Sequence, residues 1–422
     1  MAQLSYEERL NNLARLVVDV GWGGKAGVEG KPVLIYGAPS NYDLMVAIAD
    51  YAYSIGARHC IPSIIAPEIT ALHLNAHAAN GDARNEIPSV IADQWNMLVE
   101  PRGCTVRIEA AENPLAMSGC NQAHVGEYLS ASKNARNEFY EKGLFGQTLP
   151  WTIVPRATSG WAEMIFHGEE NAREKLQEVL DAILEVDHPD CVERWQRRSD
   201  AMNLRSDKLN ALQAESFHFT GDGTDLTVGI SPLAHYSAAS MELDGGIVHI
   251  ANIPTFEHYT TPDWRTVRGH VRMTRPVLLG GVLVEGLSVW FNDNGEVERF
   301  EAEEGGDAFQ ALIDAPGGNR LGELALVGID DSAIFQSGVV FRNTLLDENA
   351  ACHIAFGQAY PSQIKGGTAM SNEEKEEIGC NLTDKHHDMM ISDETTRVTA
   401  KTRNGQEVVV IEQGKWASGF KA

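Results

Sequence analysis

The side chains best suited to metal chemistry fall in four separate segments of the second half of the chain. One segment, residues 343–353, places two acids, two amides and a histidine among small residues. Carboxylates and imidazoles are the usual oxygen and nitrogen ligands of divalent metal ions in proteins. We therefore expect one metal site, assembled from residues 343–353, Glu257, Glu323 and residues 386–388.

Each candidate also has a purely structural explanation when it is considered alone. Glu257 follows Pro254-Thr255-Phe256 and can be a turn acid, and His353 can be a core histidine with its hydrogen bonds satisfied. Glu323 lies in an apolar run. A carboxylate there either faces solvent on a half-exposed strand or is buried and paired with a cation. The hypothesis of a metal site therefore depends on the combination.

The segment His386-His387-Asp388 opens a run that is typical of a β-strand. Successive side chains of a strand point to opposite faces, so His386 and Asp388 should project together while His387 points away. That arrangement suits two adjacent metal ligands.

The first half of the chain predicts an α/β domain. An amphipathic helix is expected over residues 5–20, a buried strand over 33–37, a helix over 41–56 and a second strand over 59–65. Strand, helix and strand at this spacing are typical of a βαβ unit on a parallel sheet. The turn at 37–40 has neither a Gly-x-Gly-x-x-Gly motif nor a P-loop, so the sequence gives no reason to expect a nucleotide site.

From residue 217 onward the pattern changes to short strands joined by tight turns. Hairpins are expected over residues 217–228 and 281–300, and one helix over 307–312. The prediction is an N-terminal α/β and helical domain over 1–216 and a β-rich domain over 217–422. The second domain contains all the candidate metal ligands.

The bulk properties exclude several classes of function. The chain has 422 residues, too many for a single core, and a formal net charge of -25. Such an acidic protein is not expected to bind nucleic acid or an anionic membrane. The six cysteines form no Cys-x-x-Cys pair, and neither a signal peptide nor a membrane-spanning run is recognisable. We expect a soluble cytoplasmic protein with reduced thiols.

Several long motifs, in the same order, resemble the aminopeptidase T/aminopeptidase S family of dinuclear metallopeptidases, the thermophilic aminopeptidase family. The resemblance covers nearly the whole chain and is strongest after residue 217. It is carried by residues 150–154, 223–229, 252–255, 320–327, 343–350, 353–360 and 381–391.

The resemblance implies two divalent ions (zinc, cobalt or manganese), a Tyr360 that reaches into the site, and a homodimer. It also implies that Glu323 bridges the two ions. Five ligands are too many for one tetrahedral catalytic zinc, whereas one bridging carboxylate among five residues provides three bonds to each of two ions. The implied ligands are Glu257, Glu323, His353, His386 and Asp388.

The reaction that the resemblance implies is hydrolysis of the N-terminal amide bond of peptides or aminoacyl amides. A hydroxide that bridges the metals would attack the carbonyl, and Tyr360 would hydrogen-bond the resulting oxyanion. Glu257 or Glu323 is expected to be the general base. Glu348 is expected either to hold His353 in position or to act directly.

One departure from the family keeps other functions open. Family members usually carry two consecutive acids after Pro-Thr, but here Phe256 replaces the first. The same scaffold could therefore hydrolyse the amide of a non-peptide small molecule. A mononuclear-iron, ring-cleaving dioxygenase of the dihydroxypyridine type would need only His353, His386 and Asp388. A non-catalytic protein with a structural metal is the third alternative.

Overall fold

The computed structural model describes residues 4–110, 112–280 and 282–421, and the chain divides into two compact units. The first unit is Met1–Arg198 with Ser240–Pro254, and the second is Ser199–Ala239 with Thr255–Ala422. Compared with a division after residue 216, this grouping begins the second unit at Ser199 and assigns Ser240–Pro254 to the first unit. The proposed domain boundary itself stays a prediction.

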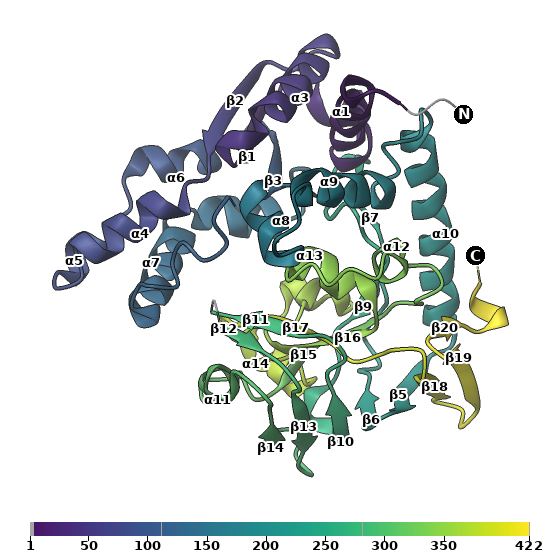
Figure 1. The fold of residues 1–422 in the computed structure, drawn as a ribbon. Coiled ribbons are helices and arrows are strands. Elements are labelled where there is room, and N and C mark those ends of the chain that lie inside the picture. Colours follow the sequence, from purple (N-terminus) through teal and green to yellow (C-terminus); the bar gives the residue numbers. More distant parts are fainter. Residues whose placement is uncertain (1–3, 111, 281, 422) are drawn as a thin grey trace. The chain divides into compact units, whose positions relative to one another are not determined.

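The first unit is built on a parallel four-stranded sheet with helices, as predicted (Figure 1). Its strand order is β2-β1-β3-β4. The predicted βαβ unit consists of β1 (Pro32–Gly37), α3 (Tyr42–Ser54) and β2 (His59–Ile64). Five of the six residues of β1 are buried, which explains its continuous apolar run. The other strands of this sheet are β3 (Cys104–Glu109) and β4 (Trp151–Pro155).

Helices and one small hairpin complete the first unit. In the described part of the chain, no helix is both long enough and apolar enough to cross a membrane. The helices are α1 (Tyr6–Arg15), α2 (Gly24–Val28), α4 (Pro67–Ala76), α5 (Gly81–Asn85), α6 (Ser89–Asn96), α7 (Gln122–Ala135), α8 (Ser159–Ile165) and α9 (Ala172–Ile183). The hairpin is β7 (Ser240–Glu242) with β8 (Val248–Ile250), and α10 (Cys191–Ala211) runs across the boundary into the second unit.

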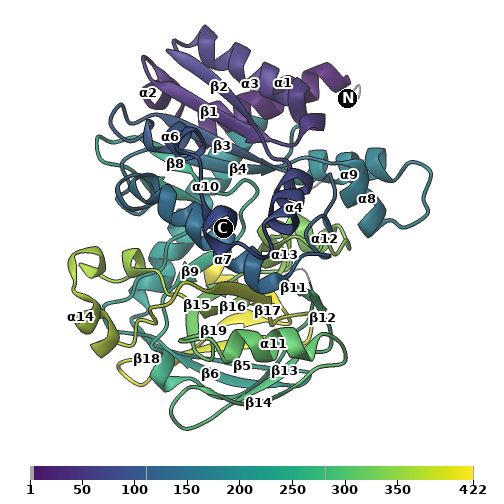
Figure 2. The same cartoon turned by 90° about the vertical axis from the view of Figure 1, so that its left-hand side faces the viewer.

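The second unit contains an eight-stranded and a four-stranded antiparallel sheet (Figure 2). The larger sheet has the order β14-β13-β10-β6-β5-β18-β19-β20. Its strands are β5 (Ala214–Gly221), β6 (Thr224–Gly229), β10 (Arg268–Arg272), β13 (Ser288–Phe291), β14 (Val297–Glu301), β18 (Arg397–Thr402), β19 (Glu407–Glu412) and β20 (Lys415–Trp416).

The smaller sheet has the order β17-β16-β15-β9. Its strands are β9 (His258–Thr260), β15 (Leu321–Leu326), β16 (His353–Gly357) and β17 (His386–Met390). The short remaining elements are β11 (Val277–Leu279), β12 (Val282–Val284), α11 (Gly306–Ile313), α12 (Ala333–Gln336), α13 (Thr344–Asp347) and α14 (Asn372–Glu377).

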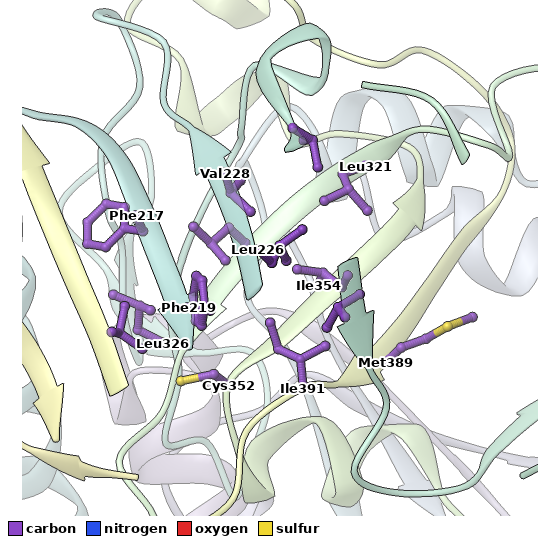
Figure 3. Packing of buried hydrophobic residues seen from close by; sticks show 14 of the residues in the cluster. Phe217, Phe219, Leu226, Val228, Leu321, Leu326, Cys352, Ile354, Met389 and Ile391 are labelled. Atoms are coloured by element: carbon purple, nitrogen blue, oxygen red, sulfur yellow. The ribbon is translucent and has the colours of Figure 1, made fainter. Parts of the chain in front are cut away.

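The main core of the second unit includes inward side chains of both sheets (Figure 3). Phe217 and Leu226 come from the eight-stranded sheet, and Leu326, Ile354 and Met389 come from the four-stranded sheet. Because strand side chains alternate, the residues between these core positions must point to the opposite face of the four-stranded sheet. That opposite face carries the candidate metal ligands.

Candidate metal centre

The candidate ligands on β15, β16 and β17 share one face of the four-stranded sheet. The strand register pairs Glu323 with Ala355, and Ala355 with Asp388, so these three side chains form one row. The neighbouring row pairs Ala325 with His353. The alanine side chains end at a methyl group, which leaves room above this face between the acids and the histidine.

The five predicted ligands come together as two groups that share Glu323. Within each group the ligand atoms lie within 4.8 Å of one another. In the first, His353 Nε2 lies 3.1 Å from Glu257 Oε2 and 3.9 Å from Glu323 Oε1. In the second, His386 Nε2 lies 3.1 Å from Glu323 Oε2 and 3.3 Å from Asp388 Oδ1.

The carboxylates of these groups are buried without lysine or arginine side chains to balance them. Glu323 is 3% and Asp388 7% exposed. Among the described residues, no lysine or arginine forms an ion pair with Glu257, Glu323 or Asp388; their ion-pair partners are the two histidines. Burying like charges together is costly unless cations compensate them.

The proton affinities in the site reflect this imbalance. Burial raises the pKa of Glu323 above its ordinary value, and nearby Asp388 and Glu257 add to the effect. Burial alone would lower the pKa of His353, but the Glu257 hydrogen bond and the surrounding carboxylates outweigh it and raise the pKa to about 9. The charge of His386 lowers the pKa of Asp388 to about 2, against the effect of burial.

Hydrogen bonds orient His386 and Tyr360. A carbonyl oxygen only accepts, so the 2.7 Å contact of His386 Nδ1 with the Gln358 carbonyl places the proton on Nδ1. Nε2 then faces the acids, as a metal ligand requires. The Tyr360 hydroxyl lies 3.1 Å from this Nε2. Burial and the charge of Glu323 raise the pKa of Tyr360 well above its ordinary value, which keeps the phenol protonated.

The acids and amides of residues 343–353 mostly hold the backbone around the site. Asp347 accepts a hydrogen bond from the Phe341 amide at 3.0 Å and pairs with Arg275 at 3.2 Å. Asn349 accepts a 2.7 Å hydrogen bond from the amide of Phe256, the residue before Glu257. The side chain of Phe256 is 1% exposed, so its ring does not form an open pocket wall.

Glu348, for which the sequence left a positioning or a direct role open, lies near the candidate ligands. Its carboxyl group, when protonated, donates a hydrogen bond to Asp388. Burial raises its pKa well above the ordinary value, and Asp388, Glu257 and Glu323 raise it further. Glu348 is thus a fourth carboxylate at this centre. No periodic pattern in the sequence marks it, because it lies in a single 3-10 turn after α13.

Tyr259 also lies at the site, although its sequence position alone did not mark it. It pairs with Ala325 across β9 and β15 and therefore lies on the ligand-bearing face. Its ring is 5.7 Å from the Tyr360 ring, at an interplanar angle of 70°. Its position two residues after Glu257 could have indicated the shared face by the same alternation used for His386 and Asp388.

A sequence model of the thermophilic metalloprotease (M29) family matches residues 6–416. The chain belongs to this family. The M29 match agrees with the resemblance in the sequence motifs, and it covers both units. A metalloprotease needs a bound metal ion, and the paired carboxylate and histidine groups are the described residues that could hold one.

Similar M29 proteins carry aminopeptidase names. Aminopeptidase T of Thermus aquaticus is 32% identical over 422 residues, covering 98% of this chain and 99% of that protein. Aminopeptidase AmpS of Bacillus subtilis (strain 168) is 30% identical over 416 residues, with 98% and 99% coverage. The solved structure of wild-type AmpT from Thermus thermophilus has a TM-score of 0.88 and 30% identity, covering 98% of this chain and 100% of that chain.

Proposed function

We propose that this protein is a dinuclear metal-dependent aminopeptidase that hydrolyses the N-terminal amide bond of peptides or aminoacyl amides. The observation that carries the proposal is the pair of ligand groups that share Glu323. One shared carboxylate with two separate partner sets is the arrangement expected of a two-metal site. The aminopeptidase names of the full-length relatives support the choice of substrate.

The residues present fit two divalent ions. Glu257, Glu323, Glu348 and Asp388 are four neighbouring carboxyl groups that lack lysine and arginine partners among the described residues. Two divalent cations would more than balance the three ligand carboxylates, while the raised pKa of Glu348 keeps that carboxyl protonated. The first ion would be held by Glu257, His353 and Glu323, and the second by Glu323, His386 and Asp388. When bound, zinc, cobalt or manganese supplies a Lewis acid for the carbonyl and a hydroxide nucleophile at neutral pH.

The protein's own side chains orient the substrate and donate or accept protons. The protonated Tyr360 hydroxyl donates a hydrogen bond to the oxygen that becomes negative as the carbonyl is attacked. Glu257 and Glu323, whose charges act on Tyr259, lie where the free α-amine of the substrate would bind, which accounts for a preference for a free N-terminus. Glu257 or Glu323 serves as general base for the attacking water, and Glu348 is placed to relay the proton through its hydrogen bond with Asp388.

The two catalytic alternatives have less support. Of the described residues, His353 is not grouped with His386 and Asp388, so a single iron site of these three has no geometric support. An amide hydrolase for a non-peptide small molecule would use the same metal centre. The burial of Phe256 gives no direct contact by which that residue would select such a substrate.

We further propose that the protein is a cytoplasmic homodimer. All six cysteines are free, as expected for a reducing compartment. Large apolar side chains on α4 and α6 are mostly exposed, among them Ile69 (68%), Leu72 (70%) and Val90 (65%). Exposed apolar groups of this kind mark association surfaces. Sedimentation equilibrium should give the mass of two chains, and the mass of one chain would contradict the dimer.

The first test of the enzymatic proposal combines metal analysis with matched substrates. Protein purified without chelator should contain two zinc, cobalt or manganese ions per chain. It should hydrolyse aminoacyl amides but not the same amides after N-acetylation, because acetylation removes the amine that the site binds. Equal rates on both substrates would favour the non-peptide amide hydrolase. One iron per chain without hydrolysis would overturn the proposal.

A further inference from the structure

The two faces of β9 contact different parts of the second unit. Glu257 and Tyr259 lie toward the ligand-bearing face, whereas His258 points the other way and is fully buried. His258 Nδ1 lies 2.9 Å from Ser206 Oγ, and its Nε2 lies 3.2 Å from Arg205 Nη1. Both partners belong to α10.

The hydrogen-bonding capacity of Arg205 determines the protonation state and the tautomer of His258. A guanidinium group can only donate hydrogen bonds, so Nε2 of His258 must accept from Arg205. The ring is then neutral, with its proton on Nδ1, and it donates to the Ser206 hydroxyl oxygen. Two directional hydrogen bonds therefore hold the imidazole at both ring nitrogens, and they resist rotation of β9 about its axis.

Residues of the C-terminal segment and Asp331 hold Arg205 in place. Arg205 Nε donates to the Phe420 carbonyl at 2.7 Å, and Arg205 Nη1 donates to Asp331 at 2.8 Å. The guanidinium lies 4.7 Å from the centre of the Trp416 ring, and the same ring packs edge-on against His258 at 5.2 Å. Arg205 itself is 3% exposed. Trp416 and Phe420 thus contact the side chains that cover the buried face of β9.

We infer that Arg205, Ser206 and the C-terminal segment 415–420 act as a brace that positions Glu257 for metal binding. Glu257 is bonded directly to His258, and β9 has only three residues, so any shift of His258 moves Glu257 as well. Metal coordination tolerates departures of only about 0.2 Å in ligand distance. The brace supports the ion at Glu257 and His353, and the hydrogen bonds of Arg205 and Ser206 in the described part of the chain do not include His386 or Asp388. This inference rests on the proposed function.

The test measures metal affinity one ion at a time. Ser206→Ala removes one hydrogen bond to His258, and Arg205→Lys removes the fork that joins His258, Asp331 and Phe420. Leu204→Ala is the matched control, because Leu204 is on the same helix but is 63% exposed. Metal occupancy is titrated against a chelator of known affinity, and the melting temperature is recorded for each variant.

The wild type should bind two ions. The Ser206 and Arg205 variants should weaken one of the two affinities by about 10- to 100-fold and leave the other unchanged, as for other residues that orient metal ligands. The Leu204 variant should match the wild type. If Arg205→Lys fails to fold, Ser206→Ala still decides the matter. Two ions in the wild type with unchanged affinities in Ser206→Ala would overturn the brace alone. A wild type that binds no metal would overturn the proposed function, and the brace with it.

Discussion

At the scale of single residues, Glu323 is the candidate ligand that belongs to both groups. Its two carboxylate oxygens point to different histidines, Oε1 toward His353 and Oε2 toward His386. A carboxamide at this position keeps the shape of the side chain but loses the charge and one acceptor atom. The effects of Glu323→Gln on metal binding and activity can therefore be separated from those of a packing defect.

Glu323→Gln should reduce metal content to fewer than two ions per chain and lower kcat by more than about 100-fold. Residues that only orient ligands already cost 10- to 100-fold, and Glu323 is the ligand common to both groups. Metal analysis and steady-state kinetics on the same preparation would measure this. Glu298→Gln, at an exposed position of β14, is the control. Full metal content and full activity in Glu323→Gln would contradict the bridging role.

Tyr360→Phe should give a different result, because the hydroxyl is assigned to the oxyanion rather than to a metal. We expect kcat to fall by about 10²- to 10³-fold, the usual cost of losing one oxyanion donor, with two ions retained. The Tyr360 backbone is held by Thr261 through hydrogen bonds of 2.9 and 3.1 Å, so the ring should stay in place. Loss of metal in this variant would assign Tyr360 to metal binding instead.

At the scale of elements, the alternation of side chains along each strand gives the four-stranded sheet two distinct faces, one in the core and one that carries the candidate ligands. His386 and His387 are neighbours on β17, but only His386 lies in a ligand group, and His387 pairs with the core residue Phe356. The pair therefore provides its own matched control.

His386→Gln should lose the ion held by the second group, whereas His387→Gln should keep both ions and most of the activity. Both substitutions remove an imidazole of the same strand, so a general effect on folding would appear in both. Metal stoichiometry is the deciding measurement. Equal loss of metal in the two variants would mean that the strand is not aligned as its register indicates.

The alternation of strand side chains and the order of the motifs allowed much of the arrangement of these elements to be predicted from the sequence. They predicted the parallel sheet, the hairpin of β5 with β6, and the common face of His386 and Asp388. They left the role of Glu348 open and did not predict Tyr259 or the Arg205–His258 contact. These depend on side chains brought together across long separations, and β9 is too short for a periodic signal.

At the scale of the whole molecule, the site couples stability to pH and to metal. In the metal-free protein the pKa of Glu323 is raised from 4.5 and that of His353 from 6.5 to about 9. Each group binds its proton more tightly in the folded chain than in the unfolded chain. The stability from this binding is complete below the ordinary pKa values and is lost as pH rises through the higher folded values.

Metal-free protein should therefore become less stable between about pH 5 and pH 9, with a limiting slope of about 1.4 kcal/mol per pH unit for each proton involved. Metal-loaded protein should not show this loss, because ions replace the protons and bind better as the ligands deprotonate. Thermal unfolding of chelated and loaded samples across this range would test the difference. A chelated protein that gains stability toward pH 9 would contradict the assignment.

The complete burial of β15 and β16 has a consequence for how such a protein can evolve. All six residues of β15 and all five of β16 are buried, because one face is core and the other carries the ligands. An ordinary half-exposed strand tolerates substitution at every second position, but neither of these two strands has an exposed face at which substitutions would be tolerated. Inherited variation should therefore be excluded from both strands and concentrate in the connecting loops. New substrate preferences would have to arise there, leaving the metal-bearing strands unchanged.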